Sequence, residues 1–122
     1  MALDENKMNS ILLCIKHKLG VDEIDYYDMD IITDINMAFM VLNQIGIGPK
    51  EAFSITGSDE KWTDFLGNAK NLESVKTLIY LKVKMIFDPP STGTLIDAME
   101  RQISELQWRL YVTKDNESGG NT

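Results

Sequence analysis

The sequence predicts an all-α fold: a small helical bundle of about four helices, with a C-terminal helical hairpin and a short extended arm or strand in the middle loop. Apolar residues recur at spacings of three and four in four segments, as in helices that bury one face. Glycine or proline separates these segments. The alternation typical of strands is confined to two short stretches.

A chain of 122 residues is long enough for one core. We expect a single domain over residues 1–113 and a flexible tail over 114–122, which is too polar to order by itself. Twelve Lys and Arg against nineteen Asp and Glu give a net charge of -7. Such a surface does not suit tight binding of DNA phosphates, although DNA can slide past it.

Cysteine content and hydropathy suggest where the protein resides. Cys14 is the single cysteine and cannot form an internal disulfide, which fits a reducing compartment. The N-terminus lacks a basic region followed by an apolar one, and no apolar run approaches the ~20 residues of a membrane span. We expect a protein made in the cytoplasm and without a membrane partner.

The first helix is expected over residues 6–19 and ends at Gly20. An acidic run follows it, which includes Asp22, Glu23, Asp25 and Asp28. A calcium loop would need a glycine at its sixth position and a closing glutamate, and both are missing. These acids are better explained by the start of the next helix, where exposed amides favour negative charge.

The second helix is expected over residues 30–44. Its stripe contains Ile31, Ile35 and Leu42, and Met37 and Met40 widen it until little polar surface remains. Such a helix is either central in the bundle or shared between subunits.

The middle loop begins at Ile45. Its Gly-x-Gly lacks the spacing and the Lys-Ser/Thr ending of a phosphate loop, so it indicates a turn. Residues 52–56 alternate and predict a strand or arm that lies on the body or pairs with a neighbouring copy. The candidate contact residues in this loop are Ile47, Pro49, Phe53 and Ile55. Ser58 or Asp59 is then expected to cap a short helix ending at Leu66.

The third and fourth helices form the predicted hairpin. The third covers residues 72–87, with Asn71 as its N-cap; residues 81–87 also alternate, but length and the cap favour helix. Pro89 and Pro90 end it. Thr94, with Asp97 three residues later, is expected to start the fourth helix, which runs to Val112.

The fourth helix carries two apolar sides. Its inward stripe is Leu95, Met99, Ile103, Leu106 and Leu110. Trp108 lies about 200° from Leu106 and therefore belongs to a second patch near the C-terminus. The alternative is that another part of the chain covers Trp108. The composition is that of an interface hot spot, and the candidate partner-binding residues are Arg101, Glu105, Trp108, Arg109, Tyr111 and Val112.

Catalytic chemistry is not indicated. One histidine and one cysteine form no metal-ligand cluster, and nothing in sequence orients His17 and Cys14 as a catalytic pair. We therefore expect no enzyme and no cofactor.

The C-terminal half resembles the head-tail connector proteins of tailed bacteriophages, also called adaptor or head-completion proteins. The resemblance is carried by residues 80–90, which end in Phe-Asp-Pro-Pro, and by residues 100–110, which contain Glu-x-x-Trp-Arg-Leu. It extends over about residues 46–112 and is looser before them.

The resemblance implies a structural virion protein at the head-tail interface. Copies, typically twelve, would form a ring under the portal, extend the DNA channel and bind the tail or a further connector or stopper ring. The C-terminal helix and tail would reach the portal, and DNA would pass without specific binding. The candidate lumen acids are Asp22, Glu23, Asp25 and Asp28. The middle loop would touch either a neighbouring subunit or the next ring.

The alternative is a small acidic phage-encoded regulator that binds one soluble partner through the Trp108 surface. The two hypotheses differ in assembly: the adaptor joins a ring with the portal, and the regulator forms a complex of simple stoichiometry.

Overall fold

The computed structural model describes residues 5–67 and 71–119. Its described part contains no strand, and the one isolated β-bridge there pairs Ser10 with Lys61. The all-α prediction is confirmed. The helices are α1 (Glu5–Asn9), α2 (Ile11–Leu19), α3 (Asp28–Gln44), α4 (Trp62–Leu66), α5 (Leu72–Phe87) and α6 (Gly93–Gly119).

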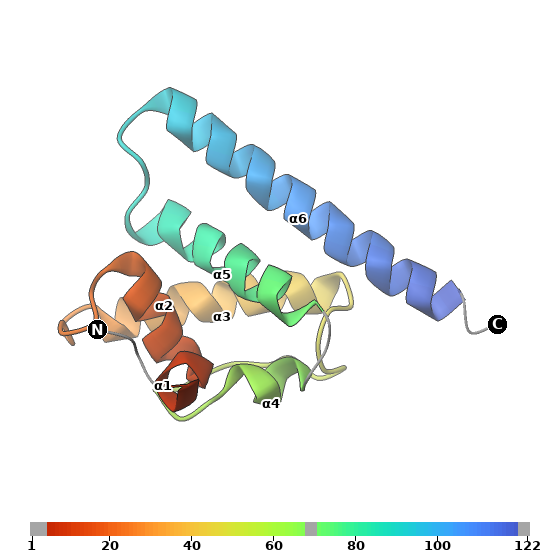
Figure 1. The fold of residues 1–122 in the computed structure, drawn as a ribbon, viewed down its shortest axis with the longest axis horizontal. Coiled ribbons are helices and arrows are strands. Elements are labelled where there is room, and N and C mark those ends of the chain that lie inside the picture. The colour runs from red at the N-terminus through yellow and green to blue at the C-terminus, as the bar shows by residue number, and fades with distance from the viewer. Residues whose placement is uncertain (1–4, 68–70, 120–122) are drawn as a thin grey trace.

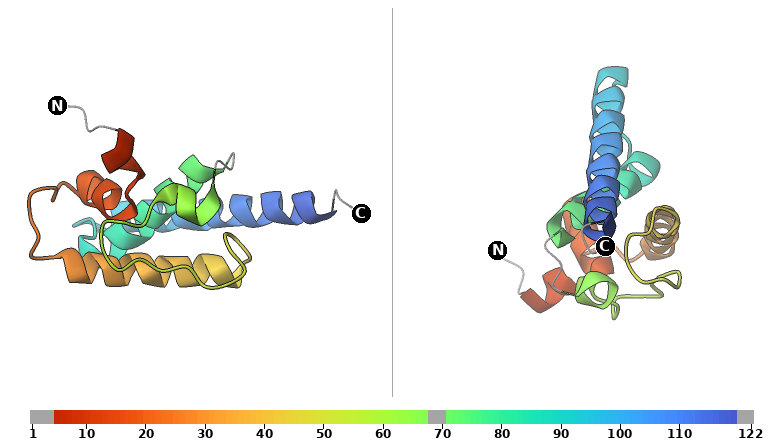
Figure 2. Two further views of the ribbon diagram at one scale, coloured as in Figure 1. Left: turned by 90° about the horizontal axis from the view of Figure 1, so that it is seen from below. Right: turned by 90° about the vertical axis from the view of Figure 1, so that its right-hand side faces the viewer.

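The centre of the bundle is α5, which packs against α3 on one side and α6 on another. Helices α5 and α6 form the predicted antiparallel hairpin (Figure 1). Helix α2 contacts both α3 and α5, while α1 and α4 lie at the lower edge. The C-terminal part of α6 runs beyond the other helices (Figure 2), so this end of the longest helix projects from the bundle.

The first helix is interrupted at Ser10, which corrects the single helix expected there. Ser10 has an extended backbone (φ -68, ψ 125), and its hydroxyl accepts a hydrogen bond from the Leu13 amide. The same hydroxyl donates to the Ser58 carbonyl over 2.8 Å. Ser10 is therefore the N-cap of α2 and also holds a segment that lies far away in sequence.

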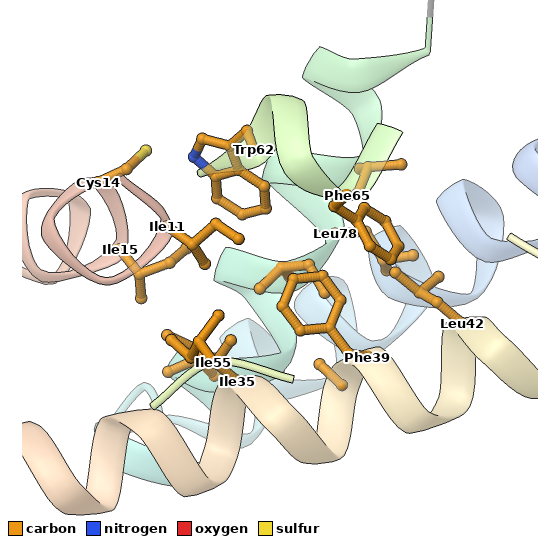
Figure 3. Packing of buried hydrophobic residues seen from close by; sticks show 14 of the residues in the cluster. Ile11, Cys14, Ile15, Ile35, Phe39, Leu42, Ile55, Trp62, Phe65 and Leu78 are labelled. Carbon is orange, nitrogen blue, oxygen red and sulfur yellow. The ribbon is translucent and has the colours of Figure 1, made fainter. Parts of the chain in front are cut away.

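Aromatic rings form the centre of the core. Phe39 is buried, and its ring centroid lies 5.2, 6.4 and 4.6 Å from those of Phe53, Trp62 and Phe65. Figure 3 shows α2 and α3 contributing isoleucines around these rings. The short α4 thus supplies two of the largest core side chains.

The expected strand over residues 52–56 is an extended segment without a partner strand. Asn36 of α3 satisfies its backbone instead. The Ile55 amide donates to Asn36 Oδ1 over 2.8 Å, and Asn36 Nδ2 donates to the Ile55 carbonyl over 3.0 Å. A side chain of α3 thus replaces a strand neighbour, and Ile55 is buried.

The turn at Gly48 depends on glycine. Its φ is +92°, and a Cβ there would overlap with the Phe65 ring. We expect Gly48→Ala to lower the free energy of unfolding by about 1–3 kcal/mol, because it combines backbone strain with overpacking. Urea unfolding measures this loss. Gly57→Ala is the control, since a Cβ at Gly57 meets nothing within 4 Å; an equal loss in both variants would contradict the prediction.

Helix α4 begins at Trp62, later than the start expected at Ser58 or Asp59. The Lys61 amide donates to Asp64 Oδ2 over 2.9 Å, which caps the helix from inside its first turn. The residues before it form a turn around Glu60. Its carboxylate accepts hydrogen bonds from the Thr56 amide and hydroxyl, both at 2.9 Å, and from the Gly57 amide. The Glu60 carboxylate is therefore the acceptor that organises this turn.

Burial alone would raise the pKa of the Glu60 carboxyl, but the hydrogen bonds from Thr56 and Gly57 outweigh it, so the pKa is lowered. The carboxylate therefore stabilises the fold above its ordinary pKa of 4.5, and this contribution is lost as the pH falls through the lower native pKa. We expect the stability difference between wild type and Glu60→Gln to be constant above about pH 5 and to shrink toward pH 3.

Urea unfolding between pH 7 and pH 3 measures this difference. Glu51→Gln is the control, because Glu51 is an exposed residue of the same loop. A difference that stays constant to pH 3 would show that the ionised form of Glu60 contributes nothing.

The hairpin helices begin close to the expected positions. Helix α5 has the predicted bounds, although Asn71 makes no side-chain hydrogen bond as its N-cap. Helix α6 starts at Gly93, and the Leu95 amide donates to Thr92 Oγ1 over 3.3 Å, so Thr92 rather than Thr94 provides the cap. Helix α6 continues to Gly119, beyond the end expected at Val112.

The inward stripe of α6 is confirmed only in part. Leu110 is buried, and Ile103 and Leu106 pack against the core. Leu95 is 56% exposed, which corrects its assignment to the stripe. It lies in the first turn of α6, next to the hairpin connection.

Candidate partner-binding site

The second apolar patch of α6 lies on the surface, as the helix geometry predicts. Trp108 is 64% exposed and Tyr111 is 44% exposed. Their rings are stacked, with centroids 6.2 Å apart and planes 27° apart. Each ring restricts the other, so a partner would meet a preformed aromatic surface. Val112, beside them, is half-buried.

Charged residues border the aromatic pair. Arg109 Nη2 forms an ion pair with Glu105 Oε1 one turn away, as the spacing predicts. Both side chains are more than half exposed, so this pair adds little stability to the isolated chain. Arg101 is also exposed. The structure therefore places all six predicted residues on α6, where five of them are exposed and Val112 is half-buried.

A shallow hollow adjoins the aromatic pair. It is lined by Trp108, Tyr111, Ser104 and Gln107 of α6 and by Ile45 just after α3. The aromatic rings therefore form one wall of a concave surface between the two helices. A partner side chain could enter this hollow and lie against the rings.

The candidate contact residues of the middle loop separate into two groups. Ile47 and Ile55 are 4% and 1% exposed and belong to the core, so the structure does not support them as contact residues. They are buried because the loop folds back onto α3. Pro49 is exposed and Phe53 is half-buried. The contact prediction therefore remains for Pro49 and Phe53 only.

The four candidate lumen acids lie in the turn between α2 and α3 and at the start of α3. Lys16 of α2, 2% exposed, forms ion pairs with Asp25 at 3.3 Å and Asp28 at 2.9 Å. His17 Nδ1 lies 2.7 Å from Asp22 Oδ2. Glu23 is exposed. Three of these acids thus also fasten the turn to α2.

The carboxylates of Asp28 and Asp25 stabilise the charged form of Lys16. Burial alone would lower the pKa of its ammonium, but the hydrogen bonds and charges of Asp28 and Asp25 outweigh it and raise the pKa. A buried lysine with two carboxylate partners explains part of the acidic run without a metal.

The described residues offer no group of three His, Cys, Asp or Glu side chains that could hold a metal ion. Cys14 is buried in the core, and His17 lies on the surface with Asp22. None of the helices, as far as they are described, is long and apolar enough to cross a membrane.

Helix α3 has an exposed apolar face, which fits one of the two predicted alternatives for this helix, that it is shared between subunits, although no site residues were predicted on it. Met29, Met37 and Met40 are 73%, 49% and 53% exposed. The sequence shows that methionines widen the apolar stripe of this helix, but it does not show which of them face solvent. The exposed face is visible only once the positions of α5 and α6 are known.

A family model described as "Phage connector protein" matches residues 11–117. The match extends over nearly all of the described helices and includes the aromatic pair of α6. Comparisons with curated proteins and with solved structures gave no match.

Proposed function

The chain belongs to the phage connector protein family, and on this basis we propose that it forms a ring, of about twelve copies, under the portal of a tailed bacteriophage. The family is a structural one, and membership implies contacts with other phage head or tail proteins and a place in the virion. In the proposed arrangement the ring extends the DNA channel and links the capsid to the tail or to a further connector ring.

The observation that carries the proposal is the exposed aromatic pair near the projecting end of α6. Trp108 and Tyr111 lie in the C-terminal half of α6, whose end extends past the other helices, and a helix that extends past its own core can reach a second protein. We assign this end to portal binding, with Arg101, Glu105, Arg109 and Val112 as its border. Large aromatic side chains and arginine dominate the binding energy of many interfaces.

The charge of the chain suits the proposed channel. A net charge of -7 disfavours adhesion of DNA phosphates, so DNA can pass without being held. We place the turn with Asp22, Glu23, Asp25 and Asp28 toward the lumen. Asp25 remains 92% exposed although it pairs with Lys16, so its carboxylate can still repel a phosphate.

The proposal is tested by mass. Native mass spectrometry and light scattering would be applied to the chain alone and after mixing with the portal protein of the same phage. A complex that contains about a dozen copies on the portal is expected. A stable dimer without portal association, or a one-to-one complex with another soluble protein, would instead favour the regulator.

A further inference from the structure

The outer face of α3 carries three exposed methionines. At about 100° per residue, Met29, Met37 and Met40 lie within about 80° of one another around the helix. Opposite them, Ile35, Phe39 and Leu42 are buried in the core. Methionine side chains adapt their shape to a partner, so a row of them on a surface suits a protein interface.

A groove continues this methionine face toward α5 and α6. It has a volume of about 280 Å³, and its apolar lining consists of Met37, Ala38, Met40, Val41, Met85, Ile86 and Ile103. Ile86 is 54% exposed. Face and groove together form a continuous apolar surface along one flank of the hairpin.

The α3 side of this flank is acidic. Helix α3 contains three aspartates and no lysine or arginine. Asp34 lines the groove, and burial together with the nearby charge of Asp30 raises the pKa of its carboxyl. Lys82 of α5 also lines the groove, so the acidic character belongs to α3 and not to the whole flank.

The opposite flank of the hairpin has a second groove. It is lined by Thr77, Tyr80 and Leu81 of α5 and by Gln102, Glu105, Leu106 and Arg109 of α6. Around α5, at about 100° per residue, Thr77, Tyr80 and Leu81 are centred about 140° from Lys82, Met85 and Ile86 of the first groove. The two grooves therefore face opposite directions, which is the arrangement that copies placed side by side require.

This second groove has a cation at each end. Arg109 lies beside Thr77, and Lys84 lies one turn from Tyr80 toward the hairpin tip. Lys84 pairs with Asp88, and Arg109 pairs with Glu105. The Arg109–Glu105 pair is exposed on both sides and therefore weak, so Arg109 can turn to an aspartate of a neighbouring α3.

We infer that the methionine face of α3 in one copy packs into the α5–α6 groove at Tyr80 and Leu106 of the next copy. This inference rests on the proposed ring. It names the contact between neighbours, which shares Glu105 and Arg109 with the border of the portal-binding end of α6 but does not include Trp108 or Tyr111. When each copy binds the next through the same heterologous contact, each copy is rotated by the same angle relative to its neighbour. The copies close into a ring if a whole number of these rotations makes a full turn.

The test is cross-linking within rings assembled on the portal. Met37 and Gln102 are exposed on the two flanks, and Cys14 is buried, so introduced cysteines would react over a low background. The double variant Met37→Cys/Gln102→Cys, treated with a short bismaleimide, is expected to give a ladder of multimers on a denaturing gel. A mixture of the two single variants should stop at dimers, and neither single variant alone should cross-link.

Met37→Cys/Thr94→Cys is the matched control, because Thr94 is exposed near the hairpin tip and away from the second groove. It should give no ladder. Melting curves and native mass confirm that each variant folds and joins the ring. A ring without a ladder would overturn the inferred contact, and dimers from Met37→Cys alone would show two-fold pairing instead. Failure to form any ring would overturn the proposed function itself.

Discussion

Phe39→Ala is expected to lower the free energy of unfolding by about 3–5 kcal/mol, the largest stability effect predicted for this chain. Phe39 is 1% exposed and contacts the rings of Phe53, Trp62 and Phe65. These partners come from the middle loop and α4, and the loop is otherwise tied to α3 through hydrogen bonds of Asn36 and Asn43. Loss of the ring would leave a cavity and also loosen the loop that covers it.

Urea unfolding, followed by tryptophan fluorescence and by circular dichroism, measures this loss. Phe39→Leu is the matched control, since it retains most of the buried volume and should cost about 1 kcal/mol. Trp62 reports on the loop, so an early fluorescence transition in Phe39→Ala would show that the loop opens first. Equal midpoints for both variants and wild type would contradict the aromatic core.

Much of the fold could be predicted because the signals are local. The bounds of α5 follow from its apolar periodicity and from the two prolines after Asp88, and the hairpin follows from the short connection. The exposure of Trp108 follows from its angle to Leu106 and Leu110. In each case, residues within two helical turns determine the outcome.

Other features depend on residues far apart in sequence. The break at Ser10 exists because the Ser58 carbonyl and the Glu60 carbonyl meet the start of α2, and no local pattern shows this. Alternation over residues 52–56 predicted a strand, but Asn36 supplies the hydrogen bonds that a second strand would have made.

The candidate site was predictable where it lies on one helix. The residues at Trp108 share α6, so periodicity was enough to group them. The surface of α3 was not predictable in this way, because Met37 and Met40 extend an apolar stripe whose exposed edge is set by α5 and α6. The loop residues Ile47 and Ile55 were misassigned for the same reason: apolar residues in a loop can face either the core or a partner.

Trp108→Ala is expected to weaken binding to the portal by about 2 kcal/mol or more, which is roughly a 30-fold rise in Kd. Because Trp108 is 64% exposed, the melting temperature of the isolated chain should change little. The loss at the interface should exceed the loss of one contact, since Tyr111 would also lose the ring on which it stacks. Interferometry with immobilised portal measures the affinity, and calorimetry measures the stability.

Leu95→Ala is the matched control for this experiment. Leu95 is also an exposed apolar residue of α6, but it lies near the hairpin tip, at the opposite end from Trp108. Its replacement should leave portal affinity unchanged. Equal weakening by both substitutions would mean that general apolar surface, and not the aromatic pair, drives association. A large fall in the melting temperature of Trp108→Ala would instead place Trp108 among the residues that stabilise the bundle.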